Sequence, residues 1–486
     1  MSSLCFRLLK SSAGKAKGSL TIMSTTQPQL TLISTDHWLQ CWFEQLILPS
    51  SRYTNSDIEY VDIATGSFAD HVSLVKKALR ERPNAVCFAC TDCAMEVYSA
   101  AVAMIRQEQS EFSLESKSTN IEGANFHCFF LATNKLACRT LVAGCDDLKF
   151  AMVRASDQHL PDLGVDGFFK PLDECGSKGV FKYNSVHGSD EAPTPNPQYT
   201  TGGTSSTSSE ATMVSEPILA SLASRHTELN DLLDPEIVGL VEEYVAPESR
   251  RVVVSIDGYV WNGNIYHYGI SDNVYKEKEG KPEEFSHLVT PSQRLTAKDI
   301  EACWEKYDTV ANDLVRRGLN NQFLDVEAFI LDDTIEGHIV VKTMEVNART
   351  FCNQLPMFSQ LFGGNTGFDG CMLSAAVDML RGIAPPMVAL DDSEGASTFS
   401  RSILVPVPVG DGTDAGVLHS QQATKVGVCA YLPLVKGCPV LVCGEDVSYY
   451  CVPGFVAQVY AIGLNEEIAL KLCNDFWNDL VKKYNN

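Results

Sequence analysis

Residues 323–350 read FLDVEAFILDDTIEGHIVVKTMEVNART and contain the features that decide the fold. Two apolar segments flank a polar stretch at residues 332–337, which contains aspartates and a glycine. Apolar runs rich in β-branched residues and separated by a short polar segment with glycine are typical of a β-hairpin. The sequence therefore predicts two paired antiparallel strands in this stretch.

The polar side chains of this hairpin fall on shared faces, because successive side chains of a strand point to opposite sides. On the first strand, Asp325 and Glu327 share a face. On the second strand, Glu345, Asn347 and Arg349 share a face. Strict alternation assigns three residues to the opposite face of the second strand: Lys342, Met344 and Val346.

Carboxylate and amide oxygens that converge from two strands are suitable ligands for Mg²⁺, which is usually held by one or two carboxylates together with substrate phosphates. A nearby arginine binds a phosphoryl or carboxylate group through its planar fork of donors. The alternative interpretation is a solvated strand face that carries ordinary charges.

The composition limits the classes of partner. The 486-residue chain is long enough for about three domains on the usual length prior. Its formal net charge is −23 and it has no basic stripe, which argues against nucleic acid as a partner. None of its apolar runs approaches the length of a membrane span. The 17 cysteines are scattered, and no second pair at zinc spacing follows the C-x-x-C of Cys90 and Cys93, so free thiols in a reducing compartment are expected.

Residues 1–28 contain one arginine, three lysines and many serines but no acidic residue. This pattern is typical of a mitochondrial transit peptide, and the alternative is a disordered tail before a second start at Met23. Of these two interpretations, the disordered tail is the default expectation, and with it a cytoplasmic location.

Residues 30–106 alternate apolar strand patterns with amphipathic helix patterns. This order predicts a small α/β layer with a parallel sheet. The expected strands are 30–34, 58–63 and 84–90, and the expected helices are 68–80 and 92–106. No G-x-G-x-x-G motif follows the first strand, so a dinucleotide fingerprint is absent.

The middle of the chain predicts a second group of elements. Residues 126–131 read as a strand, and a helix begins at residues 133–135 and ends near Gly144. Lys170 ends an apolar strand, and the Gly-Ser-Lys-Gly turn at 176–179 is either an anion cradle or an ordinary hairpin turn. A Ser-, Thr-, Gly- and Pro-rich insertion fills residues 184–212.

The remaining elements predict an antiparallel meander followed by helices. The expected strands are 236–246, 251–256 and 259–266, with a turn at Asp257-Gly258. The expected helices are 299–317 and 367–380. Short strands at 402–409, 426–434 and 439–442 and a helix capped by Asn465 are expected in the last hundred residues.

Five stretches in chain order resemble motifs of the ATP-grasp superfamily of ATP-dependent carboxylate–amine ligases. The most specific is Glu345-Val346-Asn347-Ala348-Arg349, which is similar to the family's E-x-N-x-R strand. The other four are Asn134-Lys135, Phe169-Lys170-Pro171 with the 176–179 turn, residues 240–245, and residues 326–330. The resemblance covers residues 30 to 385.

The resemblance implies a role for each matching residue. The residues expected at the ATP phosphates are Lys135, Lys170, Gly176, Ser177, Lys178 and Gly179. Those expected along the adenosine are Glu242, Glu243, Tyr244, Val245 and Glu248. The expected metal ligands are Glu327, Glu345 and Asn347, and Asp325 is a fallback ligand. Lys170 and Arg349 are the expected catalytic residues, with Arg349 on the transferred phosphoryl or the substrate carboxylate.

The implied fold is α/β and α+β and multidomain. Its expected parts are the tail 1–28, an N-terminal α/β domain 29–120, an ATP-grasp small lobe 121–245 that contains the insertion, a large lobe 246–385 with the metal site, and a C-terminal α+β capping segment 386–486.

The implied reaction joins a small carboxylate, such as an amino acid, to an amine through an acylphosphate and releases ADP and phosphate. ATP and Mg²⁺ are the expected cofactors, with Mn²⁺ as the alternative metal. Asn353 and Gln354 either reach the acceptor substrate or complete a loop. The alternatives are a small-molecule kinase and a non-catalytic ATP-binding regulator. Neither nucleic acid nor membrane is expected as a partner, and a homodimer is left open.

Overall fold

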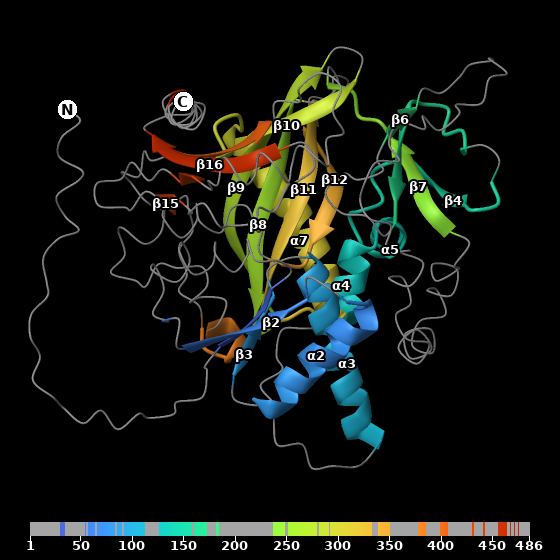
Figure 1. Ribbon diagram of the computed structural model, residues 1–486. Helices are drawn as coiled ribbons and strands as arrows, with labels where there is room; N and C mark the ends of the chain where they lie inside the picture. Colours follow the sequence, from blue (N-terminus) through green and yellow to red (C-terminus); the bar gives the residue numbers. More distant parts are fainter. Residues whose placement is uncertain are drawn as a thin grey trace, which may run out of the picture.

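The fold is known from a computed structural model (Figure 1). It describes residues 30–34, 54, 57–63, 66–82, 85–89, 92–111, 126–157, 160–172, 181–183, 237–247, 251–278, 281–290, 292–332, 339–349, 378–384, 399–406, 430–431, 441–442, 455–463, 467, 471 and 475, some of them through the backbone alone.

The N-terminal unit is the predicted parallel α/β layer. Its sheet has the order β2-β1-β3, and β1 pairs in parallel with both neighbours. Two helices follow the strands as the sequence pattern predicts, and α2 begins with a capping box between Ser67 and Asp70. The elements are β1 (Leu30–Ser34), β2 (Ile58–Asp62), α2 (Phe68–Glu81), β3 (Val86–Phe88) and α3 (Asp92–Glu111).

The expectation of a strand at 126–131 is wrong, because this stretch is the helix α4 (Phe126–Thr133). A short apolar run does not distinguish a buried strand from a buried helix. Cys128, Leu131 and Ala132, at helical spacing, are all buried in the main core. The next helix, α5 (Lys135–Leu141), begins as predicted, and the Asn134 side chain accepts a hydrogen bond from the Ala137 N–H at 2.9 Å.

The small lobe contains a four-stranded antiparallel sheet with the order β4-β7-β5-β6. Its strands are β4 (Phe150–Arg154), β5 (Gly167–Pro171), β6 (Phe181–Tyr183) and β7 (Ile237–Glu243). The last strand therefore lies between two strands that precede it by at least 60 residues. The sequence pattern predicts β5 and β7 but not β4.

The large sheet has nine strands in the order β12-β11-β8-β9-β10-β13-β16-β14-β15. Figure 1 shows it running through the middle of the molecule, with the C-terminal strands continuing it at one end. Helix α7 (Ala297–Arg316), close to the predicted 299–317, packs on one face. The strands are β8 (Val252–Trp261), β9 (Asn264–Lys278), β10 (Lys281–Thr290), β11 (Gln322–Asp332), β12 (Ile339–Asn347), β13 (Phe399–Pro406), β14 (Ala430–Tyr431), β15 (Leu441–Val442) and β16 (Phe455–Gly463).

The turn predicted at Asp257-Gly258 is wrong, since β8 runs straight through both residues. The chain turns at Asn262 and Gly263, which have φ angles of 50° and 76°. Two consecutive residues with positive φ are typical of the tight hairpin turn that Asn-Gly favours. Gly258 serves a different purpose, because a Cβ there would lie 2.5 Å from the Tyr266 carbonyl oxygen and closer still to the Tyr307 hydroxyl.

The predicted hairpin of β11 and β12 is confirmed, but its side chains do not alternate strictly. Glu327 lies opposite Glu345, whereas Ala328 lies opposite Thr343, so Met344 is the extra residue of a β-bulge. Lys342 lies opposite Phe329. The bulge therefore places Lys342 on the same side as Glu345, and the expectation that it shares a face with Val346 is wrong.

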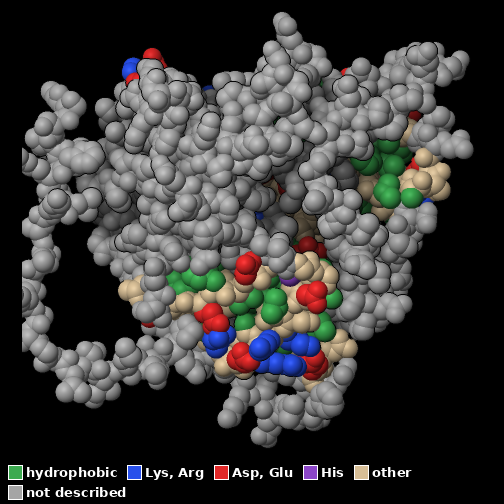
Figure 2. All heavy atoms as spheres, in the orientation of Figure 1, with side chains coloured by type: hydrophobic (Ala, Val, Ile, Leu, Met, Phe, Trp, Pro, Cys, Tyr) green, Lys and Arg blue, Asp and Glu red, His purple; other side chains and the backbone are tan. Residues whose placement is uncertain are grey.

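Most buried apolar residues of the described chain belong to one cluster that runs from the N-terminal helices through α4 and α5 to α7 and the large sheet. Figure 2 shows lysines and arginines mixed with acidic residues on one face, and the N-terminal helices carry such pairs, for example Lys76 with Glu108 at 2.8 Å. Five free cysteines within the described ranges are buried, as expected. The helices placed in the structure include none long and apolar enough to span a membrane.

Several expectations lie outside the described residues: the 1–28 tail, the 176–179 turn, the 184–212 insertion, Glu248, Asn353, Gln354, the helix cap Asn465, and most of the 367–380 helix.

We expect Gly258→Ala to lower the free energy of unfolding by about 2 kcal/mol, because the new methyl group overpacks the contact with Tyr307. Chemical denaturation measures the change. Tyr307→Phe removes the nearest atom, so the double variant should lose less stability than the sum of the two single variants. Strict additivity would contradict this account of Gly258.

Candidate functional site

The face of the large sheet opposite α7 carries two rows of polar residues. In strand order across β8, β11 and β12, the rows are Asp257–Asp325–Asn347 and Ser255–Glu327–Glu345. The neighbouring positions Ile256, Val326 and Val346 belong to the apolar core. Alternation along three adjacent strands therefore gathers four carboxylates on one side of the sheet.

Asp257 and Asp325 are buried in the middle of these rows, with exposed fractions of 4% and 0%. One oxygen of each carboxylate, Oδ2 of Asp257 and Oδ1 of Asp325, has no hydrogen-bond partner. The other oxygen of Asp325 accepts from Asn347 Nδ2 at 3.1 Å. Buried polar atoms are normally paired, so two orphaned oxygens side by side indicate a missing partner.

Burial and mutual repulsion raise the pKa of this acidic group. Desolvation, followed by the charge of Glu327, raises the pKa of Asp257 well above its usual value. Desolvation and the charge of Asp257 do the same for Asp325. The buried guanidinium of Arg349 lowers the pKa of both aspartates and of the neighbouring Glu327, but less than burial and repulsion raise it.

The phosphate-binding lysine predicted from the small lobe also faces this group. Burial, Asp325 and Glu345 raise the pKa of Glu327, while Arg349 and Lys170 lower it. Lys170 lies on β5 of the small sheet, and Glu327 lies on β11 of the large sheet. The two sheets therefore meet at a site with carboxylates on one side and a cation on the other.

The residues of this site fit a divalent cation, because the acidic group has more negative charge than Arg349 and Lys170 balance and keeps two unpaired oxygens. Among the residues that the structure describes, no three His, Cys, Asp or Glu side chains form a ready-made metal group. A protein usually holds Mg²⁺ through one or two carboxylates, and phosphates and water complete its shell. The assignment of Glu327, Glu345 and Asn347 as ligands stays a prediction.

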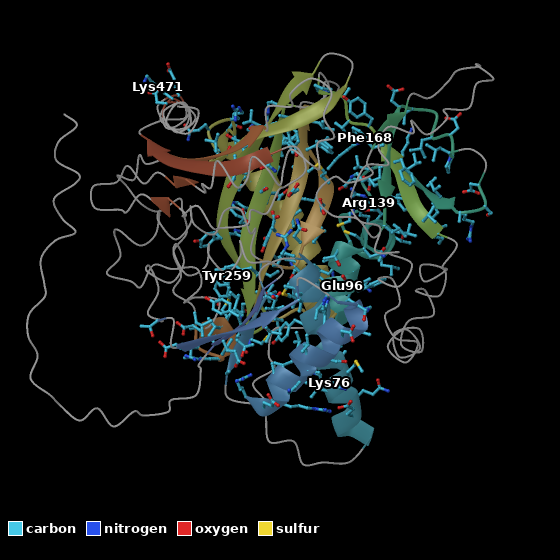
Figure 3. The ribbon with its side chains drawn as sticks, viewed as in Figure 1. Lys76, Glu96, Arg139, Phe168, Tyr259 and Lys471 are labelled. Atoms are coloured by element: carbon cyan, nitrogen blue, oxygen red, sulfur yellow. The ribbon has the colours of Figure 1, made fainter. Side chains whose placement is uncertain are left out.

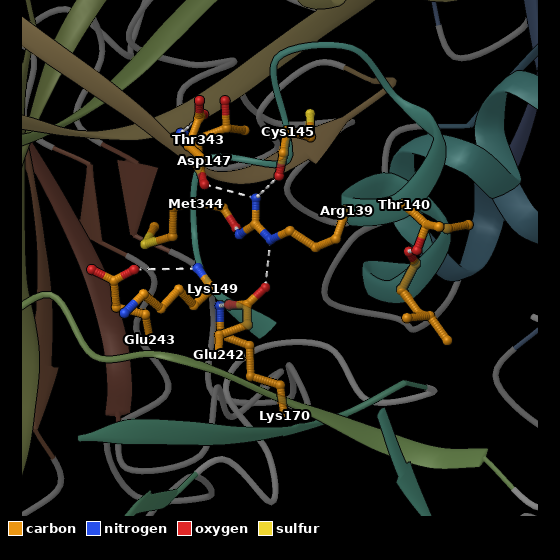
Figure 4. A network of polar contacts seen from close by, with 12 residues as sticks. Arg139, Thr140, Cys145, Asp147, Lys149, Lys170, Glu242, Glu243, Thr343 and Met344 are labelled. Carbon is orange, nitrogen blue, oxygen red and sulfur yellow. Dashed lines mark hydrogen bonds and ion pairs between the residues drawn. The ribbon is translucent and has the colours of Figure 1, made fainter. Parts of the chain in front are cut away.

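Arg139 of α5 lies at the junction between the two sheets (Figure 3). Its Nε donates to Glu242 at 2.6 Å, and Nη1 donates to the carbonyl oxygens of Cys145 at 3.0 Å and Thr343 at 2.8 Å. Nη2 donates to the Met344 carbonyl at 2.7 Å (Figure 4). One buried guanidinium thus joins the small sheet to the bulge in β12.

Glu242 is enclosed between two cations. It forms ion pairs with Arg139 and with Lys170, and its side chain is 2% exposed. Burial alone would raise the pKa of Glu242, but Lys170 and Arg139 lower it to about 2. Two further contacts hold the sheets together at this point: Lys342 with Glu243 at 3.0 Å, and the Thr343 N–H with Asp147 at 3.0 Å.

Two solved structures are similar to the whole arrangement. An L-amino acid ligase from Bacillus licheniformis has a TM-score of 0.50 at 14% identity, with 94% of this chain and 97% of that chain covered. A carboxyaminoimidazole ribonucleotide synthase from Aspergillus clavatus, complexed with ATP, has a TM-score of 0.51 at 12% identity, with 94% and 99% covered. The chain has an ATP-grasp fold. No protein-family model matches the sequence, and no curated protein matches it either.

The ATP-grasp fold gives a frame for the residues that were expected to bind ATP. Lys135 is partly exposed at the first position of α5, and Lys170 is held by Glu242. Tyr244 packs edge-on against Phe168 at 5.0 Å, and Val245 is buried. The expectation that Glu242 lies along the adenine stays a prediction; both oxygens of its side chain face Arg139 and Lys170.

Sequence reasoning missed two residues of this candidate site. Asp257 was assigned to a turn, although residues 252–261, VVVSIDGYVW, are a mostly apolar run that also fits one long buried strand. Arg139 was passed over as an ordinary helix residue. Its position after three residues that are all buried, Leu136, Ala137 and Cys138, was the available signal.

We expect the stability of the metal-free protein to fall as pH rises above about 4, because Asp257, Asp325 and Glu327 hold their protons more tightly in the folded state. Asp257→Asn removes one of the repelling charges. It should raise the melting temperature at pH 7 and flatten this pH dependence, as measured by thermal denaturation with a chelator present.

Asp272→Asn is the matched control. Asp272 is equally buried, but its carboxylate accepts from the Ser292 hydroxyl at 2.5 Å and from the Gln293 N–H at 2.7 Å. Its replacement should destabilise the protein, since it weakens satisfied bonds. If Asp257→Asn destabilised as much as Asp272→Asn, the proposed excess of negative charge would be wrong.

Proposed function

We propose that this protein is an ATP-dependent ligase that joins a small carboxylate to an amine and releases ADP and phosphate. The observation that carries the proposal is the polar face of β8, β11 and β12, where four carboxylates lie in register beside the buried Arg349. Lys170 of the small sheet acts on one of them, Glu327. The similarity to solved ATP-grasp ligases supports it through the fold. An amino acid or a similar metabolite is the proposed acid.

Glu327, Glu345 and Asn347 would hold Mg²⁺, or Mn²⁺ in its place, with Asp325 and Asp257 beside them. When bound, the metal supplies positive charge that neutralises the phosphate oxygens of ATP. Its charge would also offset the negative charge of Asp257 and Asp325, each of which has one unpaired oxygen.

The chain itself positions the reactants. Lys170 and Lys135 bind the phosphates, and Arg349 binds the substrate carboxylate or the transferred phosphoryl group through its fork of donors. A carboxylate oxygen attacks the γ-phosphorus, the bond to the β,γ-bridging oxygen breaks, and ADP leaves. The amine nitrogen then attacks the acylphosphate carbon, loses a proton, and expels phosphate. Because both substrates are held against one face of the sheet, each bimolecular step becomes effectively unimolecular.

A kinase of the same fold would use similar phosphate contacts on a hydroxyl acceptor, and a regulator would bind ATP without turnover. The retained acidic rows, with Lys170 and Arg349 facing them, favour a catalytic site over a regulatory one. Incubation with Mg·ATP and pools of amino acids and small carboxylates, followed by measurement of ADP and free phosphate, separates the three. Both products appear for a ligase, only ADP for a kinase, and neither for a regulator.

Glu345→Ala should lower kcat by about a hundredfold or more while the fold stays intact, because it removes a charge that holds the metal against the phosphates. Glu345 is exposed, so little stability should be lost. The control is Glu305→Ala, which removes an exposed glutamate from α7 and should leave turnover unchanged. Full activity in Glu345→Ala would contradict the assignment of Glu345 as a metal ligand.

A further inference from the structure

We infer that Arg139 is a positioning residue that fixes the phosphate lysine and the metal strand relative to each other. The inference rests on the proposed function, since it concerns the same site. Arg139 touches neither of the proposed ligand groups directly. It acts through Glu242 on Lys170, and through backbone carbonyls on β12.

The contact with β12 falls on the bulge. The bulge is what places Glu345 opposite Glu327. If the register of Ala328 with Thr343 continued without it, Met344 would lie opposite Glu327, and Glu345 would lie opposite Val326 on the face that packs on α7. A bulge disrupts the hydrogen-bond ladder locally, so its carbonyl groups need partners from elsewhere. Arg139 supplies donors to the carbonyls of Thr343 and Met344, at 2.8 and 2.7 Å.

The contact with Lys170 passes through Glu242. The carboxylate of Glu242 has Arg139 on one oxygen and Lys170 on the other. Arg139 fixes the orientation of the carboxylate, and the carboxylate in turn restrains the long, flexible lysine side chain. Lys170 is therefore held where its charge reaches Glu327 in the opposite sheet.

Only an arginine fits this position. Its planar group carries five donors at fixed angles, and here Nε, Nη1 and Nη2 serve three different segments at once. A lysine offers a single point charge and cannot reach all of these oxygens. A buried ion pair is weak evidence of stabilisation, since apolar residues of similar volume are often as stable. A geometric role explains why the charge is there.

The test compares Arg139→Lys with Arg317→Lys. Arg317 is a matched control because it too bridges an acid, Asp313 at 2.9 Å, and a carbonyl oxygen, that of Leu141 at 2.7 Å. Leu141 ends the helix that carries Arg139, so both variants loosen a contact of α5, and the comparison isolates the contacts of Arg139 with Glu242 and β12. We expect Arg139→Lys to weaken binding of Mg·β,γ-imido-ATP by about tenfold to a hundredfold, as loss of a supporting contact typically does. Arg317→Lys should lower the melting temperature but leave nucleotide affinity unchanged.

A second variant keeps the test decisive if Arg139→Lys does not fold. Glu242→Gln retains the shape of the side chain and leaves Arg139 its three carbonyl partners, but removes the charge between Arg139 and Lys170. It should also weaken nucleotide binding by about tenfold, and calorimetry measures the affinity without turnover. Affinities within about twofold of wild type in a folded Arg139→Lys or in Glu242→Gln would overturn the inference.

The same measurements separate this inference from the proposed function. If wild-type protein binds the nucleotide but forms no ADP with any substrate pool, the ligase proposal fails while the affinities still decide the role of Arg139. If wild-type protein binds no nucleotide, both proposals fail. Loss of affinity in the Arg139 and Glu242 variants, with turnover in the wild type, supports both.

Discussion

The buried ion pair between Arg139 and Glu242 is the constraint on which the rest of the site depends. Burying two charges is costly unless every donor and acceptor finds a partner. Here the remaining donors of Arg139 satisfy carbonyls in the α5–β4 segment and in β12, and the second oxygen of Glu242 meets Lys170. The requirement to satisfy these groups therefore brings three separate parts of the chain together at one point.

The acidic rows differ from this ion pair, because their charges are not fully paired. Their partners are incomplete, and burial together with repulsion raises the pKa of each central carboxylate. Such an arrangement weakens the protein alone, and natural proteins accept this where function needs it. A rigid scaffold is what makes it tolerable: the apolar face of the same strands packs against α7, and Tyr307 fits against Gly258 in the middle of β8. Apolar packing on one face of the sheet thus compensates for the repulsion between carboxylates on the other.

The parts that could be predicted from sequence depend on local pattern. The N-terminal α/β layer, α7 and the β11–β12 hairpin follow from periodicity, and the motif resemblance led to the fold. The failures have physical causes. The Asp257-Gly258 pair is typical of a hairpin turn, but in the structure both residues lie within β8, where Gly258 leaves room for Tyr307. The carbonyl groups at the Met344 bulge accept hydrogen bonds from Arg139, more than 200 residues distant, and β10 pairs with a strand more than 100 residues later in the chain. No short window of sequence reports such contacts.

The junction at Arg139 also has a consequence for folding. The guanidinium and its acceptor in Thr343 are 204 residues apart in sequence, and Glu242 is 103 residues from Arg139. Contacts of such long range form only after the entropy of closing the intervening chain has been overcome, so the large sheet and the small sheet must largely exist first. The polar site between the sheets is thus completed late, and a chain with only one of its two sheets folded lacks half of that site. Because the closure cost grows only with the logarithm of loop length, the long segment between β6 and β7 adds little to this barrier.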